Sequence, residues 1–270
     1  MDTTAQITLQ IKRFLNRMSM CHSYLAFRCH PNRKRHSKSR RYLTVNSLQY
    51  DMQNVVFDDL VTRLGSTHDV PIIAVSGFYG AGKTEFCKAF ANHLQTRMIK
   101  PVHVHTDMYF RYSRAERAEV LAAFRKQNEY ESRQAEAYAL NTPLMLAHLA
   151  SMKQQQAVHA SGMYRRETGA KDLEINLACE GNALVLYDGM WILDASLRQF
   201  YDIVLFLTAP RDVRIQRTIR RANQQTRPYT VTARLFDDID RFTTSYLNSQ
   251  LRDSDVLIDT SDYASPSIIQ

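Results

Sequence analysis

The chain has 270 residues, 44% of them hydrophobic and 23% charged, which is enough for one large domain or for a domain with an appendage. No stretch approaches the roughly 18 consecutive apolar residues of a membrane-spanning helix, so we expect no membrane span. The net charge of +8 is concentrated in one place, because seven basic residues and no acidic one lie between Arg28 and Arg41. The rest of the chain is near neutral, so we interpret this run as a solvated segment and disfavour nucleic acid as a partner.

The cysteines are too few and too scattered for a disulfide framework, which favours a reducing compartment and a cytoplasmic location. Two of them stand in "CHSYLAFRCH", Cys21 to His30, where each cysteine precedes a histidine. This spacing matches no common zinc motif, so we expect no metal there. We interpret residues 1–45 as a basic N-terminal appendage and residues 46–270 as the main domain.

Beyond the appendage, helical and strand patterns alternate. A helix is expected to begin at a capping Asn46 or Ser47 and to end at Gly65. The expected strands are Ile72–Val75, Pro101–Thr106, Ala183–Asp188, Ile203–Thr208 and Val256–Asp259. Helical patterns between them cover Thr84–Gln95, Pro143–Lys153, Val213–Ala222 and Ala233–Leu251. This alternation predicts an α/β fold with a five-stranded parallel sheet flanked by helices.

The stretch "GFYGAGKT", Gly77 to Thr84, follows the first strand, leads into a helix, and fits the pattern G-x-x-x-x-G-K-[ST]. Its glycines let backbone N–H groups turn toward phosphate oxygens, and the helix N-terminus adds partial positive charge. Lys83 can reach the β- and γ-phosphates of ATP, and the Thr84 hydroxyl can bind Mg²⁺, so ATP and Mg²⁺ are the expected cofactors. The residues expected at the nucleotide are Gly77, Phe78, Tyr79, Gly80, Ala81, Gly82, Lys83, Thr84 and Glu85.

Two of the expected strands end in an aspartate. Asp107 follows "HVHT", and Asp188 closes "ALVLY". Ligands of open parallel sheets bind beyond the carboxyl ends of the strands, which is also where the phosphate loop lies. A carboxylate in that place is typical of a Mg²⁺ ligand or a catalytic base, whereas a helix cap or a turn aspartate is the structural alternative.

From Ile72 to Asp259 the chain resembles the uridine kinase/phosphoribulokinase-like family of P-loop kinases. The segments that carry the resemblance, besides the phosphate loop, are "TDMYFR", "VLYDGMWIL", "PRDVRIQRTIRRANQQTR" and "SDVLID". The resemblance implies a P-loop kinase fold with a small acceptor-binding hairpin and an arginine-bearing lid. It also implies an ATP-dependent kinase that transfers a γ-phosphoryl group to a hydroxyl of a small-molecule acceptor.

The resemblance assigns roles to individual residues. Lys83, Asp107, Arg217 and Arg221 would be catalytic, with Asp107 as the base that accepts the acceptor proton. Thr84, Asp107 and Asp188 would bind Mg²⁺, although Asp188 stands where uridine kinases usually carry glutamate and could reach the ion through a water. The acceptor would contact Tyr109, Phe110, Tyr164, Arg166 and Arg227.

One departure from the family pattern bears on the acceptor. Nucleoside kinases of the family have a histidine a few residues after the hairpin tyrosine, where this chain has Gly169, while Arg165 and Arg166 add positive charge. A site that lacks one hydrogen-bond partner discriminates poorly for the matching substrate. This disfavours a plain nucleoside and leaves nucleosides, sugars and sugar phosphates open as acceptors.

Two other classes of function compete with a small-molecule kinase. The main alternative is a nucleic-acid-binding P-loop ATPase that uses the basic run between Arg28 and Arg41. A GTP-dependent switch needs an N-K-x-D segment to read guanine, and "AKD", Ala170 to Asp172, lacks the leading residue. The sequence leaves the oligomeric state, including a homo-oligomer, open.

Overall fold

The structure is a computed structural model that describes residues 45–64, 69–129, 136, 138–192, 194–224 and 229–269. The basic run between Arg28 and Arg41 and the lid residue Arg227 therefore lie outside the described residues, and the appendage remains a prediction. In chain order the elements are α2 (Val45–Leu64), β1 (Ile72–Gly77), α3 (Lys83–Thr96), β2 (Lys100–His105), η1 (Thr106–Tyr109), α4 (Arg114–Lys126), α6 (Thr142–Lys153), β3 (Val158–Met163), β4 (Leu173–Leu177), β5 (Ala183–Asp188), α7 (Ala195–Arg198), β6 (Ile203–Thr208), α8 (Arg211–Gln224), α9 (Tyr229–Arg252), β7 (Val256–Asp259) and β8 (Ser267–Ile268).

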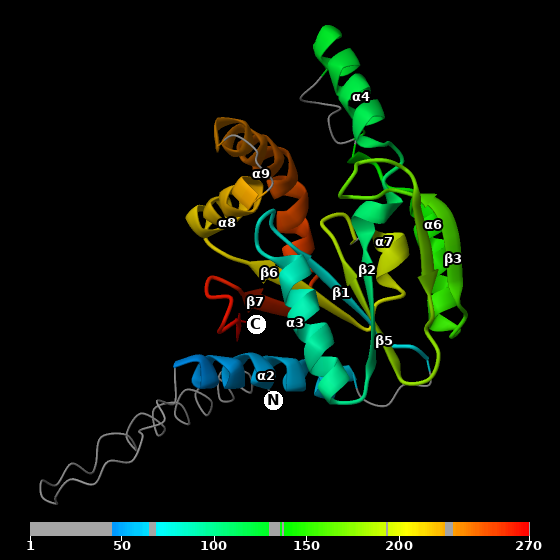
Figure 1. The fold of residues 1–270 in the computed structure, drawn as a ribbon, viewed down its shortest axis with the longest axis vertical. Coiled ribbons are helices and arrows are strands. Elements are labelled where there is room, and N and C mark those ends of the chain that lie inside the picture. The colour runs from blue at the N-terminus through cyan, green and yellow to red at the C-terminus, as the bar shows by residue number, and fades with distance from the viewer. Residues whose placement is uncertain are drawn as a thin grey trace, which may run out of the picture. The chain divides into compact units, whose positions relative to one another are not determined.

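A six-stranded sheet in the order β2-β5-β1-β6-β7-β8 forms the centre of the described chain (Figure 1). All neighbouring pairs from β2 to β7 are parallel, and only β8 runs antiparallel, beside β7. The α/β class and the parallel sheet are confirmed, but the expected count of five strands was one too low. The two-residue strand β8 carries no alternating pattern and forms only by pairing with the edge of β7, so local sequence does not reveal it.

Alternate residues of each central strand face opposite sides of the sheet and build two cores. On one side, Ile73 and Val75 of β1 pack with Phe57 of α2 and Phe90 of α3. On the other side, Ile72 and Ala74 join a cluster that reaches α6 and the β3–β4 hairpin. Helices therefore cover both faces of the sheet, as strand–helix alternation predicts.

Helix α4 is absent from the sequence-based expectations, although its N-terminus has a clear signal. The side chain of Ser113 accepts a hydrogen bond from the Glu116 N–H, and the Glu116 side chain accepts one from the Ser113 N–H. This capping box, S-x-x-E, is a sequence pattern typical of a helix N-terminus.

Within the described part of the chain, no helix is both long and apolar enough to cross a bilayer.

The sheet brings the ends of three strands to one level. In the parallel register, Asp188 at the end of β5 pairs with Val75 of β1 and with His105 of β2. The phosphate loop after β1 and the η1 turn after β2 therefore begin beside Asp188. This edge of the sheet is where the candidate site lies.

Candidate active site

The phosphate loop is shaped by glycines that the surrounding backbone requires. Gly77 has φ +145°, and a Cβ atom there would lie 2.2 Å from the backbone oxygen of Leu207 in β6. No side chain can stand that close to a carbonyl oxygen, so β1 and β6 approach each other here only because residue 77 is glycine. The loop ends at Gly82, where α3 begins with Lys83.

Lys83 turns back over this loop. Its Nζ donates hydrogen bonds to the backbone oxygens of Gly77, at 2.9 Å, and Phe78, at 3.1 Å. Burial lowers the pKa of Lys83 to about 8, even though the negative charges of Asp188 and Asp107 oppose that shift. The ammonium group is thus held against the loop, where a bound phosphate would stabilise its charge.

A cavity of about 550 Å³ opens beside the loop and collects most of the expected site residues. Of the residues expected at the nucleotide, the acceptor or the lid, the following line it: Tyr79, Gly80, Gly82, Lys83, Thr84, Glu85, Asp107, Arg166, Arg217 and Arg221. Gly77, Phe78 and Ala81 are part of the loop but do not contribute to the described lining. Residues from the loop, the η1 turn, the hairpin and the lid helix thus meet at one space.

Asp107 stands in this cavity among positively charged and imidazole groups. Its Oδ2 lies 3.6 Å from Nε of Arg166 and 3.7 Å from Nε2 of His105. Arg166 also contacts His105 through Nη1 and Nε2. Arg166 and His105 both line the cavity and both approach Oδ2 of Asp107. The Asp107 carboxylate is therefore oriented toward the cavity, and its side chain is partly exposed.

Asp188 lies behind the cavity and is fully buried. His103 Nε2 donates to its Oδ2 at 3.1 Å, and His105 Nδ1 lies 2.5 Å from its Oδ1. Burial alone would raise the pKa of Asp188, but the two histidines outweigh it and hold that pKa well below its usual range. The same contacts raise the pKa of His105, against the opposite effect of its own burial.

The three aromatic residues expected at the acceptor lie in the core instead of lining the described cavity. Tyr109 is 1% exposed, and its hydroxyl pairs with Nδ1 of His148 at 3.0 Å. Phe110 and Tyr164 pack edge to face, with ring centroids 5.3 Å apart. The three rings therefore pack in the core, and none of them lines the described cavity.

Two arginines of α8, Arg217 and Arg221, line the cavity, and Arg217 also contacts the loop after β7. Arg217 Nη2 donates to the backbone oxygens of Thr260, at 2.5 Å, and Ser261, at 3.0 Å, and its guanidinium stacks 4.2 Å from the Tyr263 ring centroid. Burial lowers the pKa of Arg217, although nearby acidic groups oppose this. Arg217 therefore ties α8 to the loop after β7, while Arg221 lines the cavity from the next turn.

Several residues of the site region were not among the expected ones, and three of them have notable contacts. Tyr263 lines the cavity beside Gly82, and His103 and His105 flank Asp188. The two histidines had a signal, because "HVH" places residues two apart on one side of a strand. Tyr263 had none, since its approach to Gly82 depends on the path of the chain after β7.

The donor set suits Mg²⁺ in part. Thr84 and Asp107 both line the cavity and offer the hydroxyl and carboxylate oxygens that Mg²⁺ prefers. Asp188 does not line it and already faces two histidines. A direct ligand role therefore fits Thr84 and Asp107 better than Asp188.

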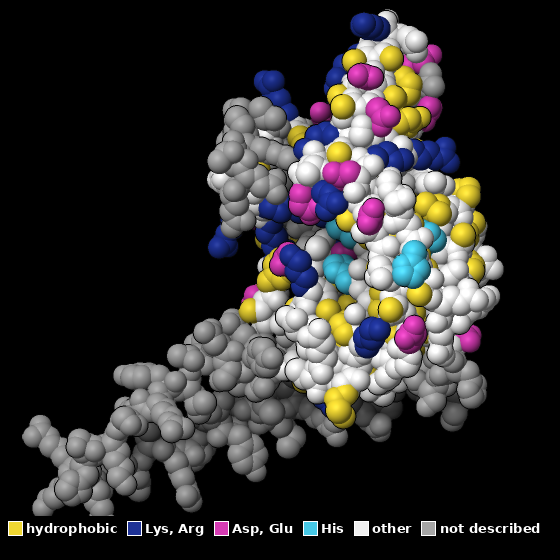
Figure 2. All heavy atoms as spheres, turned by 45° about the vertical axis from the view of Figure 1, so that its right-hand side comes forward, with side chains coloured by type: hydrophobic (Ala, Val, Ile, Leu, Met, Phe, Trp, Pro, Cys, Tyr) yellow, Lys and Arg dark blue, Asp and Glu magenta, His cyan; other side chains and the backbone are white. Residues whose placement is uncertain are grey.

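Figure 2 shows Lys and Arg side chains mixed with Asp and Glu side chains in the upper half of one face, with histidines near its centre. The lining of the cavity itself includes Lys83, Arg166, Arg217 and Arg221. Positive charge that lines a cavity raises the local concentration of anionic ligands.

Comparison with known proteins places these features in a family context. The model of the Phosphoribulokinase / Uridine kinase family matches residues 72–263. A uridine kinase of Listeria monocytogenes serotype 4a (strain HCC23) is 25% identical over 152 residues, which are 56% of this chain and 66% of that protein. The match thus spans slightly less than two thirds of the relative's length.

Solved structures share the fold at low sequence identity. A possible uridine kinase from Bacillus stearothermophilus has a TM-score of 0.51 and 15% identity, and the likeness covers 77% of this chain and 97% of that one. A D-glycerate 3-kinase from Cryptococcus neoformans var. grubii serotype A also has a TM-score of 0.51, with 11% identity over 73% of this chain and 87% of that one. At such identities the likeness shows the fold alone.

Proposed function

This chain belongs to the phosphoribulokinase/uridine kinase family, and we propose that it is an ATP-dependent kinase that phosphorylates a hydroxyl group of a small molecule. One observation carries the proposal: Lys83, Thr84, Asp107, Arg217 and Arg221 all open onto the same cavity. The uridine kinases and the D-glycerate 3-kinase with which it shares sequence or fold act on different acceptors, so they support the reaction class and leave the acceptor open.

Lys83 and the lid would neutralise phosphate charge. The backbone N–H groups of the loop and the N-terminus of α3 face the place where the phosphates of ATP would lie. Lys83 would exchange its bonds to the Gly77 and Phe78 carbonyls for bonds to phosphate oxygens. Arg221 would reach the transferred group from the lid, and Arg217 would hold the lid helix in place.

Asp107 would orient and deprotonate the acceptor hydroxyl. Its partly exposed carboxylate and its contacts with Arg166 and His105 fit a base that points into the cavity. Mg²⁺ held by Thr84 and Asp107 would supply further charge neutralisation at the phosphates. Catalysis would then consist mainly of positioning and electrostatic stabilisation.

We propose further that the acceptor carries an anionic group, as a sugar phosphate does. Arg165 is engaged with Asp172 in an ion pair of 2.8 Å, whereas Arg166 turns into the cavity next to Asp107. A guanidinium beside the catalytic base would bind a phosphate or carboxylate of the acceptor with two parallel hydrogen bonds. Gly169 also supports an acceptor other than a plain nucleoside, because the nucleoside kinase histidine does not fit at this position. A histidine there would need φ +79°, and its Cβ would lie 2.7 Å from the Arg114 side chain.

The proposal is tested by measuring ADP release with matched acceptors: uridine, free sugars, their phosphates and glycerate. We expect the phosphorylated acceptors to be preferred, and Lys83→Ala to lower kcat by about 10²–10³, the cost of losing one charge-stabilising donor. Lys88→Ala is the matched control, because Lys88 stands on the same helix in an exposed pair with Glu85. Arg166→Ala should raise KM for phosphorylated acceptors more than for neutral ones, while Arg165→Ala should not.

Other outcomes would redirect the assignment. Efficient turnover of uridine would return the chain to the nucleoside kinases. ADP release that requires DNA or RNA and falls steeply with salt would favour the nucleic-acid-binding ATPase instead.

A further inference from the structure

Three potential metal ligands converge behind the phosphate loop. They are Cys87 of α3, His103 of β2 and Asp188 of β5, and one donor atom from each lies within 4.8 Å of the other two. Cys87 and Asp188 are fully buried, and the His103 side chain is 25% exposed. The three elements pack against one another in the sheet core, so the arrangement is set by the fold and not by mobile side chains.

The chemistry of this set differs from that of the Mg²⁺ site. Mg²⁺ takes oxygen ligands and dehydrates reluctantly, whereas a thiolate and an imidazole favour borderline ions such as Zn²⁺. Zn²⁺ binds sulfur at about 2.3 Å and nitrogen or oxygen at about 2.0–2.2 Å, so small rotations would bring the three donors onto one ion. We propose that Cys87, His103 and Asp188 bind a thiolate-preferring divalent ion such as Zn²⁺, with a fourth position open to water.

The surroundings of Asp188 also bear on this site. Its carboxylate is fully buried, with His103 Nε2 3.1 Å from Oδ2 and His105 Nδ1 2.5 Å from Oδ1. An ion bound between Cys87, His103 and Asp188 would replace the direct contact of His103 with this carboxylate, while His105 would stay beside the other oxygen.

The ion would also balance charge. Neutral His103 and the anions of Cys87 and Asp188 would carry two negative charges, which a divalent ion cancels. Binding of an ion to the Cys87 sulfur releases the thiol proton, so the site should favour ions that hold thiolate strongly.

The site is separate from the position proposed for Mg²⁺. Thr84 lines the cavity at the first turn of α3, whereas Cys87 lies in the core packed with Phe86 and Phe90. His105, which contacts the other oxygen of Asp188, would orient that carboxylate as a second-layer partner. An excess of Mg²⁺ should consequently not displace the ion.

The test is a Co²⁺ titration of the full-length chain in a Cys21→Ser/Cys29→Ser background, which removes the cysteines outside the described residues. We expect one equivalent of Co²⁺ to bind with a thiolate-to-cobalt charge-transfer band that persists in millimolar Mg²⁺ and is displaced by Zn²⁺. Cys87→Ala should abolish the band, and His103→Gln should weaken binding about tenfold or more. Cys179→Ser is the matched control, because Cys179 is buried in the opposite core.

Three results would overturn the proposal: no charge-transfer band, a band that survives Cys87→Ala, or loss of the ion in Mg²⁺. His103→Gln alters a partly exposed side chain at the edge of the sheet, so it remains informative if Cys87→Ala does not fold. Because ion binding is read spectroscopically, the result does not depend on the kinase activity proposed above.

Discussion

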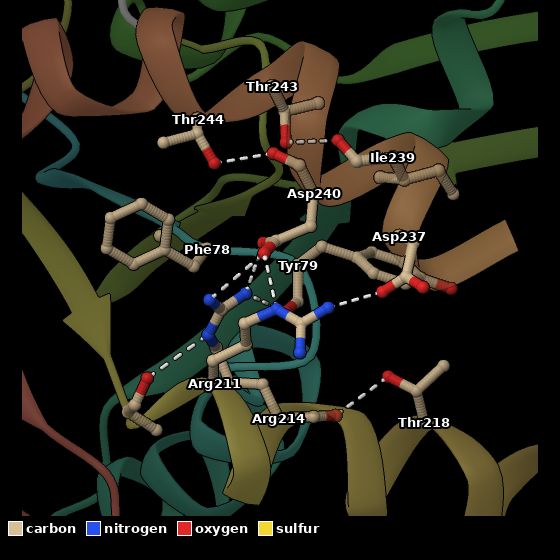
Figure 3. Close-up of polar contacts among 12 residues, drawn as sticks. Phe78, Tyr79, Arg211, Arg214, Thr218, Asp237, Ile239, Asp240, Thr243 and Thr244 are labelled. Carbon is tan, nitrogen blue, oxygen red and sulfur yellow. Dashed lines mark hydrogen bonds and ion pairs between the residues drawn. The ribbon is translucent and has the colours of Figure 1, made fainter. Parts of the chain in front are cut away.

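Arg214 of α8 and Asp240 of α9 form a buried ion pair, with Nη1 2.5 Å from Oδ1 (Figure 3). The same Nη1 donates to the backbone oxygen of Tyr79 in the phosphate loop at 3.0 Å, and Nε donates to Ala209 at 3.1 Å. One side chain thus connects α8 and α9 to the loop. Phe78 and Phe236 cover the guanidinium at 5.0 and 5.6 Å and exclude water from it.

Asp240→Asn should destabilise the protein strongly. Removing one charge of a buried pair leaves the other uncompensated, which costs about 3–5 kcal/mol of unfolding free energy. Asp237→Asn is the control on the same helix, because it breaks an exposed ion pair with Arg211. The Arg211 side chain is 57% exposed and that of Asp237 is 46% exposed, so the loss should cost at most about 1 kcal/mol of unfolding free energy. Denaturant titrations of both variants measure the difference in unfolding free energy. Equal losses of unfolding free energy would contradict the prediction that breaking the buried pair costs more than breaking the exposed one.

Gly77→Ala should disrupt the junction of β1, β6 and the phosphate loop. The added Cβ would meet the Leu207 backbone oxygen at 2.2 Å, and neither strand can retreat without breaking sheet pairing. Gly181→Ala is the control, because Gly181 also has positive φ, +66°, but open space around it, and should cost only about 1–2 kcal/mol of strain. Melting temperatures measured with and without ATP distinguish Gly77→Ala from Gly181→Ala. A Gly77→Ala protein with the melting temperature and ATP binding of the parent would contradict the close approach of residue 77 to Leu207.

The sequence predicts the parts of the site that depend on local order. The strand, the loop and the helix from Ile72 to Thr96 are contiguous, so their residues determine one another's positions. The end of β2 is equally local, and Asp107 lies in the cavity as its place after a strand predicts. The geometry of such motifs can be predicted from sequence, because it depends on residues that are close together in the chain.

Other features depend on residues far apart in the chain. Arg214 sits in a helix rich in arginine, and nothing near it indicates that Asp240, 26 positions later, will bury it. Tyr109 and Phe110 follow Asp107 in sequence, but both rings pack into the core, Tyr109 with His148 and Phe110 with Tyr164. Hydrophobicity predicts that such rings are buried somewhere, while only the packed structure shows where.

ATP binding should weaken as pH rises above 8. The pKa of Lys83 is lowered to about 8 in the free protein, so the cation is lost above that pH, whereas bound phosphates would keep it protonated. Binding then requires proton uptake, and affinity for a non-hydrolysable ATP analogue should fall roughly eightfold between pH 7.5 and 9. Calorimetry measures this, and Lys83→Arg should flatten the profile because a guanidinium does not titrate in this range. The same pH dependence in Lys83→Arg would assign it to another group.

Asp107→Asn should separate catalysis from binding and from folding. The amide keeps the shape of the side chain but cannot accept a proton, and loss of a general base costs typically about 10²–10⁴ in kcat. Affinity for ATP should change far less, since the loop backbone and Lys83 make most of the nucleotide contacts expected here. Stability should also change little, because the Asp107 side chain is 26% exposed and its contacts with Arg166 and His105 are long.

Asp172→Asn is the matched control for Asp107→Asn. Asp172 pairs with Arg165, is 55% exposed and does not line the cavity, so its loss should leave kcat within a few-fold of the parent. A structural aspartate at position 107 would give the reverse pattern: turnover within a few-fold, and a loss of stability near the ~1 kcal/mol of a removed helix cap. Steady-state kinetics with a saturating acceptor, paired with thermal melts of the same preparations, decide between the two, because a base and a cap cannot produce the same combination of kcat and melting temperature.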